Sequence, residues 1–294
     1  MLEPTDTLWR YMKLSTFLLL LDGKAWLPSI ATLQSMDALE GRLGVDFHEN
    51  LWAELGRQGK GLREQTEKWL HESLDPSMQR MLGLNPGHRD LGSRVLGNAY
   101  AEILARRRVA WCWFKSDLES AGMWSIYGNR GIAVCTSPEQ LDQSFPAGKE
   151  RTIESMIYVD RRPCPDNSLQ RLIHERPEAI LRPYFLKAAE YEHENEVRLV
   201  AHCPEGAAGI LVKDIKAENL INEIVISPLL PLDESEALKG FLTDRFPHFK
   251  DKIEQSDLNG KNNPGIADIT NELRYGTTDD LMNLPALPTA LKNL

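Results

Sequence analysis

The chain lacks the short motifs that mark the commonest nucleotide and metal sites. It contains neither Gly-x-Gly-x-x-Gly nor Gly-x-x-x-x-Gly-Lys-Ser/Thr, which excludes the usual dinucleotide-binding and phosphate-binding loops. No His-Glu-x-x-His or Cys-x-x-Cys spacing occurs, so we expect no metal cofactor. Only four cysteines are present, and their scatter favours reduced thiols in a cytoplasmic protein.

Positive charge and long apolar runs are also scarce. The 34 Lys and Arg are outnumbered by 43 Asp and Glu, giving a formal net charge of −9, so we expect no extended nucleic-acid binding. The apolar run Phe17–Leu21 stops at Asp22, too short to cross a bilayer and without the features of a signal peptide. We therefore expect no membrane contact, and nothing in the sequence predicts an oligomeric state.

The hydrophobic pattern predicts strands scattered among helices, without regular strand-helix alternation. This order favours an α+β fold with a mixed or mostly antiparallel central sheet and several helices around it. We predict one such domain over residues 1–250 and a loosely packed tail over 251–294, where Asn, Gly, Pro and Thr accumulate. Strands are expected at 8–11, 24–29, 109–114, 131–136, 153–159, 196–202, 209–212 and 224–227. Helices are expected at 15–22, 49–74, 91–108, 120–127, 166–192 with a break at Pro183, and 232–245, and a further helix is expected to open at 137–139.

The segment 191–200 carries the most informative charges. It begins as a polar helix end and continues as a strand in which Glu194, Glu196 and Arg198 recur at every second position. Alternate side chains of a strand point the same way, so the three charges are expected on one face and Val197 and Leu199 on the other. Charges placed this near a core form either a fixed ion-pair rib or part of a site.

The chain contains Trp124-Ser125-Ile126-Tyr127-Gly128 and Glu194-Asn195-Glu196-Val197-Arg198. Together with several other segments, they resemble the bacterial family labelled domain of unknown function 2971, over roughly residues 8 to 250. The Trp-Ser-x-Tyr-Gly and Glu-x-Glu-x-Arg pieces are the most specific. The resemblance implies a bacterial cytoplasmic protein with a place in defence systems. The matching segments are 8–11, 25–28, 37–40, 112–114, 123–128, 131–134, Lys187 with 194–198, and 224–228. The chain departs from the family pattern at 35–40, where the family has Asn-Asp-Pro-Phe-Glu, and at 112–114, where it often has Cys-Phe-Ser.

The order of these motifs is similar to that of ADP-ribosyltransferases, with an early Arg, a central Ser and Tyr, and a late Glu around NAD. This likeness implies a fold similar to theirs and an NAD-consuming transferase or glycohydrolase. Arg10 would bind the pyrophosphate, Tyr127 would stack on nicotinamide and Ser125 would hydrogen-bond nearby.

The same likeness implies a catalytic carboxylate on the late strand. Glu196 is the first choice and Glu194 the second, because a carboxylate stabilises the oxocarbenium character that develops as the glycosidic bond breaks. Arg198 completes the NAD-binding set as the residue that orients Glu196. Convergence of Arg10, Tyr127 and Glu196 on one cleft would support this hypothesis.

Two other hypotheses fit the same residues. The charges could be a structural rib that reaches Arg10 or Lys187, in a non-catalytic sensor or interaction protein. Alternatively, Asp37, Glu40, Glu194 and Glu196 could surround a divalent metal in a nuclease-like enzyme, since hard cations prefer carboxylate oxygens. The sequence leaves all three open.

Overall fold

A seven-stranded sheet organises the chain. The structure, a computed structural model, describes residues 2–35, 37, 40–41, 101, 103–159, 182–204 and 206–259. The strand order is β11-β10-β4-β1-β3-β8-β5, antiparallel throughout except between β10 and β11. The predicted α+β fold with a mostly antiparallel mixed sheet is therefore confirmed. The strands are β1 (Leu8–Met12), β3 (Arg108–Lys115), β4 (Ile132–Thr136), β5 (Arg151–Ser155), β8 (Glu196–His202), β10 (Glu223–Ile226) and β11 (Ile253–Gln255).

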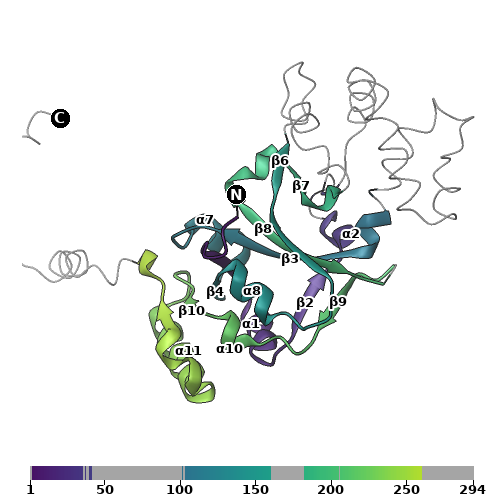
Figure 1. Ribbon diagram of the computed structural model, residues 1–294. Coiled ribbons are helices and arrows are strands. Elements are labelled where there is room, and N and C mark those ends of the chain that lie inside the picture. The colour runs from purple at the N-terminus through teal and green to yellow at the C-terminus, as the bar shows by residue number, and fades with distance from the viewer. Residues whose placement is uncertain are drawn as a thin grey trace, which may run out of the picture.

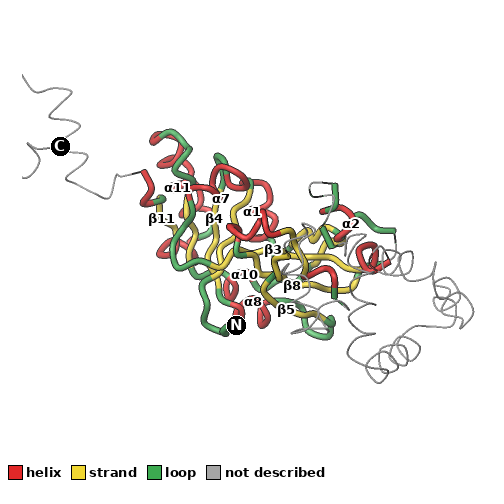
Figure 2. The backbone as a smooth tube through the Cα atoms, turned by 90° about the horizontal axis from the view of Figure 1, so that it is seen from above, coloured by secondary structure: helices red, strands yellow, loops and turns green. Residues whose placement is uncertain are grey.

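Two small ribbons and several short helices surround this sheet (Figure 1). The antiparallel ribbon pairs β2 (Ala25–Pro28) with β9 (Gly209–Val212), and the parallel one pairs β6 (Ile157–Val159) with β7 (Leu186–Ala188). Figure 2 places α11 and β11 at one end of the molecule and α2 at the other. The helices are α1 (Leu14–Leu21), α2 (Ile30–Leu33), α7 (Ala121–Met123), α8 (Pro138–Ser144), α10 (Ala217–Leu220) and α11 (Leu232–Arg245), with a π-helix at Trp124–Gly128. The 3₁₀ helices are Pro183–Phe185, Ala189–Glu194, Pro247–Lys252 and Asp257–Asn259.

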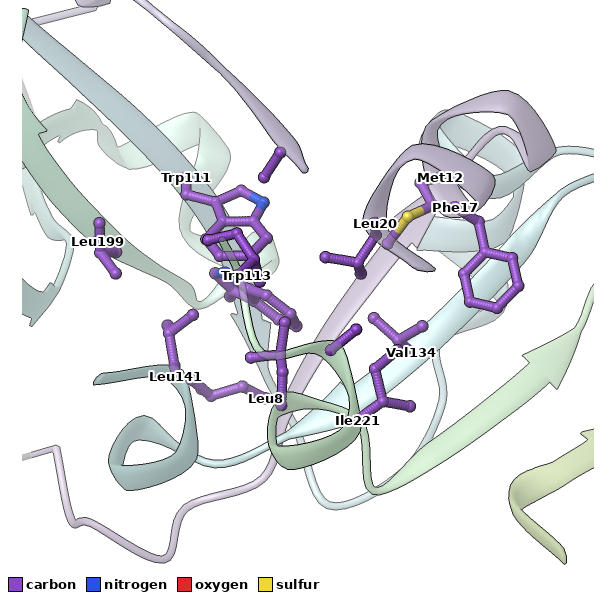
Figure 3. Packing of buried hydrophobic residues seen from close by; sticks show 14 of the residues in the cluster. Leu8, Met12, Phe17, Leu20, Trp111, Trp113, Val134, Leu141, Leu199 and Ile221 are labelled. Carbon is purple, nitrogen blue, oxygen red and sulfur yellow. The ribbon is translucent and has the colours of Figure 1, made fainter. Parts of the chain in front are cut away.

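One face of the sheet, the core face, carries the main hydrophobic core. Alternate residues of β1, β3 and β8 point into it, because side chains of a strand alternate between faces. Helices α1, α8 and α10 cover this face with their apolar side chains. Figure 3 shows Trp111 and Trp113 of β3 near Leu8 of β1 and Leu141 of α8. Both tryptophans are thus part of the main core.

The opposite face, the network face, holds aromatic side chains and charges. Trp9 and Tyr11 of β1 lie there with Phe114 of β3 and with Trp124, which begins the π-helix. The register places Trp9 beside Phe114 and Phe114 beside Glu196. Glu196 on β8 therefore continues a row that starts with two aromatic side chains, Trp9 on β1 and Phe114 on β3.

Three predicted elements differ from the structure. The helix expected over 166–192 is, in its described part, two 3₁₀ helices around strand β7, because residues 186–188 pair with β6. The strand expected over 153–159 is divided, since the Met156 N–H donates to the Glu196 carbonyl before β6 starts towards β7. Most of the expected tail, residues 260–294, lies outside the described residues, and its first part contains β11, which extends the sheet.

Two further helices were expected in the first half of the chain. The one at 49–74 lies outside the described residues, and so does most of the one at 91–108, of which residues 103–107 are helical. None of the helices in the described ranges is long and apolar enough to cross a membrane.

Candidate functional site

The Glu196 and Arg198 side chains lie on the network face of β8, one strand period apart. The register pairs Glu196 with Phe114 and Arg198 with Cys112 of β3, while Val197 and Leu199 point into the main core. The alternation expected from the sequence is confirmed for these four residues. Both charged side chains are thereby placed inside the protein.

Glu194 reaches the same region by a different backbone path. It ends a 3₁₀ helix instead of belonging to the strand, and Asn195 then adopts a left-handed conformation with φ 43° and ψ 51°. Asn195 is fixed there by β3, because its Nδ2 donates to the Lys115 carbonyl at 2.8 Å and its own carbonyl accepts the Lys115 N–H at 2.9 Å. The expectation that Glu194 shares an extended strand with Glu196 is therefore wrong, although both side chains converge.

Arg198 joins two carboxylates and a backbone carbonyl. Its Nε donates to Glu196 Oε1 at 2.6 Å and its Nη2 to Glu196 Oε2 at 3.1 Å. Its Nη1 donates to Glu40 Oε1 at 2.6 Å and to the Tyr184 carbonyl at 3.0 Å. The planar guanidinium suits this forked arrangement, since it presents several N–H donors in fixed directions.

Lys187 links the two carboxylates of the motif. Its ammonium donates to Glu196 Oε2 at 2.9 Å and also to Glu194 Oε2. The Tyr127 hydroxyl donates to the other oxygen of Glu194 at 2.9 Å. A continuous chain of contacts thus runs from Glu40 through Arg198, Glu196, Lys187 and Glu194 to Tyr127, and we call it the charge network.

Burial gives this charge network its electrostatic character. Glu40, Lys187, Glu194, Glu196 and Arg198 are only 1–6% exposed. Burial opposes ionisation of Glu196, but Arg198 and Lys187 outweigh it and lower the pKa of this carboxyl to about 2. Burial also acts against the charge on Lys187, yet the two glutamates raise its pKa above the ordinary value. Each of the five side chains makes at least one ion pair with another of them.

Cys112, which is paired with Arg198 across the β3-β8 register, also lies near Glu196. Burial, followed by the negative charge of the nearby Glu196 carboxylate, raises the pKa of the Cys112 thiol far above its usual value. A thiol held in this protonated form is a poor nucleophile, because the thiolate is the reactive species. Cys112 is therefore a poor candidate for a catalytic nucleophile.

Arg10 enters from the other side of the sheet. It alternates with Trp9 and Tyr11 along β1, so its side chain leaves the strand on the core face. The guanidinium lies 5.9 Å from the Trp111 ring centroid and donates to the Cys112 carbonyl. Its charge acts favourably on Glu196 through space. Arg10 and Glu196 are thus electrostatic neighbours whose side chains start on opposite faces.

The two polar residues of the central Ser-x-Tyr motif lie in different environments, one in solvent and the other at the charge network. Ser125 is exposed, and its hydroxyl donates to the Ala121 carbonyl at 3.1 Å within the helix. Tyr127 is half-buried, with its ring centroid 5.1 Å from that of Phe114. Trp124 is fully buried. Tyr127 is the residue of this motif that joins the charge network.

One network residue was missed from the sequence. The Tyr158 hydroxyl accepts the Glu196 N–H at 2.7 Å, and burial of the phenol raises its pKa to about 12. Tyr158 stands opposite Lys187 in the parallel β6-β7 pair. A pairing between strands so distant in sequence leaves no spacing signal, so no local pattern could have found it.

The metal hypothesis places Asp37, Glu40, Glu194 and Glu196 around one divalent ion. Glu40, Glu194 and Glu196 are engaged by arginine or lysine cations, and the Asp37 carbonyl accepts the Glu40 N–H at 2.9 Å. Within the described part of the chain, no group of three or more His, Cys, Asp or Glu side chains is arranged to hold a metal ion. A divalent ion there would have to compete with cations already in contact.

Comparison with known proteins adds no relative. The chain matches no protein-family model, no curated protein and no solved structure. The resemblance noted in its motifs therefore stays a prediction.

Proposed function

We propose that the chain acts without catalysing a reaction, as a sensor or interaction protein of a bacterial defence system. The observation that carries this proposal is the Glu196 carboxylate, which is 2% exposed and has both oxygens occupied by Arg198 and Lys187. A catalytic carboxylate must reach a reacting atom of its substrate. This one reaches two cations, and a pKa of about 2 makes it a weak base.

The charge balance of the region supports the same proposal. Three carboxylates contact the cations of Lys187 and Arg198 directly, and Arg10 adds a third positive charge nearby. A site built for an anionic ligand such as a pyrophosphate needs cations that are free to pair with it. Here the cations are paired within the protein, which suits a brace between β8, β7 and the segment that holds Glu40.

The deciding experiment compares stability with NAD turnover in the full chain. We expect the wild type neither to bind NAD in calorimetry nor to release nicotinamide, and Glu196→Gln to lower the free energy of unfolding. Glu234→Gln serves as the control, because Glu234 is exposed. NAD cleavage by the wild type that Glu196→Gln abolishes at unchanged stability would overturn the proposal.

A second candidate is the NAD-consuming enzyme suggested by the motif order, favoured by the link between Tyr127 and Glu194. In this candidate the half-buried Tyr127 ring stacks on nicotinamide and the exposed Ser125 hydroxyl bonds to the carboxamide. The bond between the ribose carbon and the nicotinamide nitrogen breaks, and its electron pair leaves with nicotinamide. Water or an acceptor then forms the new bond, and its proton passes to Glu196.

This candidate requires the network to open, because Lys187 stands between the two glutamates. Opening would replace the Lys187 contacts of Glu196 with contacts to the substrate. The measurement that favours it is release of nicotinamide that falls at least tenfold in both Glu196→Gln and Tyr127→Ala, roughly the loss of one interaction made in the transition state. Equal stability of these variants and the wild type is needed to assign such a loss to chemistry.

A further inference from the structure

The carboxylate of Glu119 connects two segments that are far apart in the sequence. Its Oε2 accepts the Trp124 indole N–H at 2.7 Å and the Ser256 hydroxyl at 2.7 Å. Its Oε1 accepts the Asp257 backbone N–H at 3.0 Å. Trp124 begins the π-helix, whereas Ser256 and Asp257 directly follow β11. One side chain thus holds both segments by charge-assisted hydrogen bonds, which are stronger than neutral ones.

The indole of Trp124 is fixed at both of its ends. Its N–H is bound by Glu119, and its six-membered ring lies against Gly128, where an added Cβ would approach Cε3 to 2.3 Å. The Tyr11 ring meets it edge-on with centroids 4.9 Å apart. The ring therefore spans the π-helix from its first residue to its last and defines its path.

This π-helix also positions Tyr127, which binds Glu194 of the charge network. π-helical turns are rare and recur at functional positions, where they set a side chain at an angle that an α-helix does not allow. The orientation of Tyr127 thus depends on the π-turn, the π-turn depends on Trp124, and Trp124 is anchored by Glu119.

The negative charges around Glu119 oppose its contact with the segment Ser256–Asp257. The pKa of Glu223 on β10 is raised by burial first, then by the negative charges of Glu254, Glu119 and Asp257. Carboxylates that repel one another are thus gathered where the segment after β11 reaches the π-helix. The hydrogen bonds to Glu119 offset that repulsion and add to the backbone bond from the Ser256 N–H to the Ile226 carbonyl, at 3.2 Å, in holding the segment.

We propose that Glu119 is a positioning residue that couples the segment Ser256–Asp257 to the π-helix and so to Tyr127. When Ser256 and Asp257 bind its carboxylate, the Trp124 indole is held and Tyr127 stays on Glu194. When they leave, the carboxylate is freer to turn towards water and the π-helix loosens. This coupling goes beyond the proposed function and holds whether or not the chain is an enzyme.

Hydrogen-deuterium exchange of the full chain tests this coupling with a matched pair of serine variants. Ser256→Ala removes the bond to Glu119 together with the 3.2 Å bond from the Leu258 N–H. Ser137→Ala removes the same combination elsewhere, a hydroxyl bond to the Gln140 side chain and a backbone N–H bond at 3.3 Å. We expect Ser256→Ala to accelerate exchange of amides 124–128 about tenfold, and Ser137→Ala to leave them unchanged.

Glu119→Gln provides the second measurement and should accelerate the same amides, since an uncharged amide binds the Trp124 and Ser256 donors more weakly. The inference is overturned if both Ser256→Ala and Glu119→Gln change exchange only at residues 253–259. It is equally overturned if Ser137→Ala accelerates the π-helix as much as Ser256→Ala does. If Glu119→Gln does not fold, the serine pair decides the question alone.

Discussion

Arg198 binds the Glu196 carboxylate through two nitrogen atoms, Nε at 2.6 Å from Oε1 and Nη2 at 3.1 Å from Oε2. The two residues stand two positions apart on β8, so the alternation of the strand places both side chains on one face. Both are almost fully buried. Removing two charges from water costs free energy. The loss of stability is therefore largest when one partner of such a pair is replaced and the other stays buried without it.

Replacing Arg198 by Met should therefore destabilise the fold strongly. Glu196 would keep Lys187, but Glu40 would lose its ion pair with Arg198, which would leave carboxylate charge in the interior. We expect a loss of about 3–5 kcal/mol in the free energy of unfolding, measured by urea titration. Arg130→Met is the control, because the Arg130–Glu234 pair is half-exposed and should contribute less than about 1 kcal/mol. Equal losses in both variants would contradict the structural role of Arg198.

The stability of the protein should also depend on pH through Glu196. Its folded pKa of about 2 lies below the ordinary value of 4.5, so its contribution is present above pH 4.5 and is lost as the pH falls towards 2. The contribution is on the order of 3 kcal/mol. The gap in unfolding free energy between wild type and Glu196→Gln should narrow steadily over this range. A gap that is constant from neutral pH down to pH 3 would refute the low pKa.

Local patterns predicted the parts of the fold that depend on neighbouring residues. The helix expected over 232–245 and the strand expected over 196–202 each have the expected bounds in the structure. The strand β7 was missed, because Leu186–Ala188 follows a helical turn and pairs with a strand almost thirty positions earlier. Pairing over such a distance overrides local propensity and is invisible in a window of neighbours.

The site shows the same division between local and distant information. Period two was enough to place Glu196 and Arg198 together, and Lys187 was one of two partners considered. The face on which Arg10 lies depends instead on how β1 pairs with β3 and how β3 pairs with β8. These pairings place Trp9 on the same face as Glu196. Strand alternation predicts that Arg10 and Trp9 point to opposite faces of the sheet. The spacing of residues in the sequence does not show which of these faces carries the charged residues of the network.

The buried tyrosines give a second prediction about pH, at the alkaline end. Burial is the main cause that raises the pKa of Tyr11 and of Tyr158 to about 12, so both should ionise late in the folded protein. In the unfolded chain phenols ionise near pH 10, so stability should fall as the pH rises from about 10 towards 12. Tyrosinate absorbance followed with and without urea measures this difference. Tyr158→Phe should remove one late step, and an unchanged titration curve would contradict the assignment.

Two glycines should respond to alanine in opposite directions. At Gly128 an added Cβ would lie 2.3 Å from Cε3 of Trp124, and this ring cannot yield because Glu119 and Tyr11 hold it. Gly128→Ala should destabilise the protein by about 1–3 kcal/mol, the range for overpacking a filled core. At Gly240 nothing lies within 4 Å of an added Cβ.

Gly240 is in the interior of α11, so alanine there should stabilise the fold by about 0.5–1 kcal/mol by restricting the unfolded chain and favouring the helix. Thermal and urea unfolding of the two variants beside wild type measures both signs. If Gly128→Ala were as stable as wild type, the Trp124 indole could not be fixed against the π-helix, and the anchoring role assigned to Glu119 would fail with it. If Gly240→Ala alone departed from expectation, only the description of α11 would need revision, since no contact of the charge network involves that helix position.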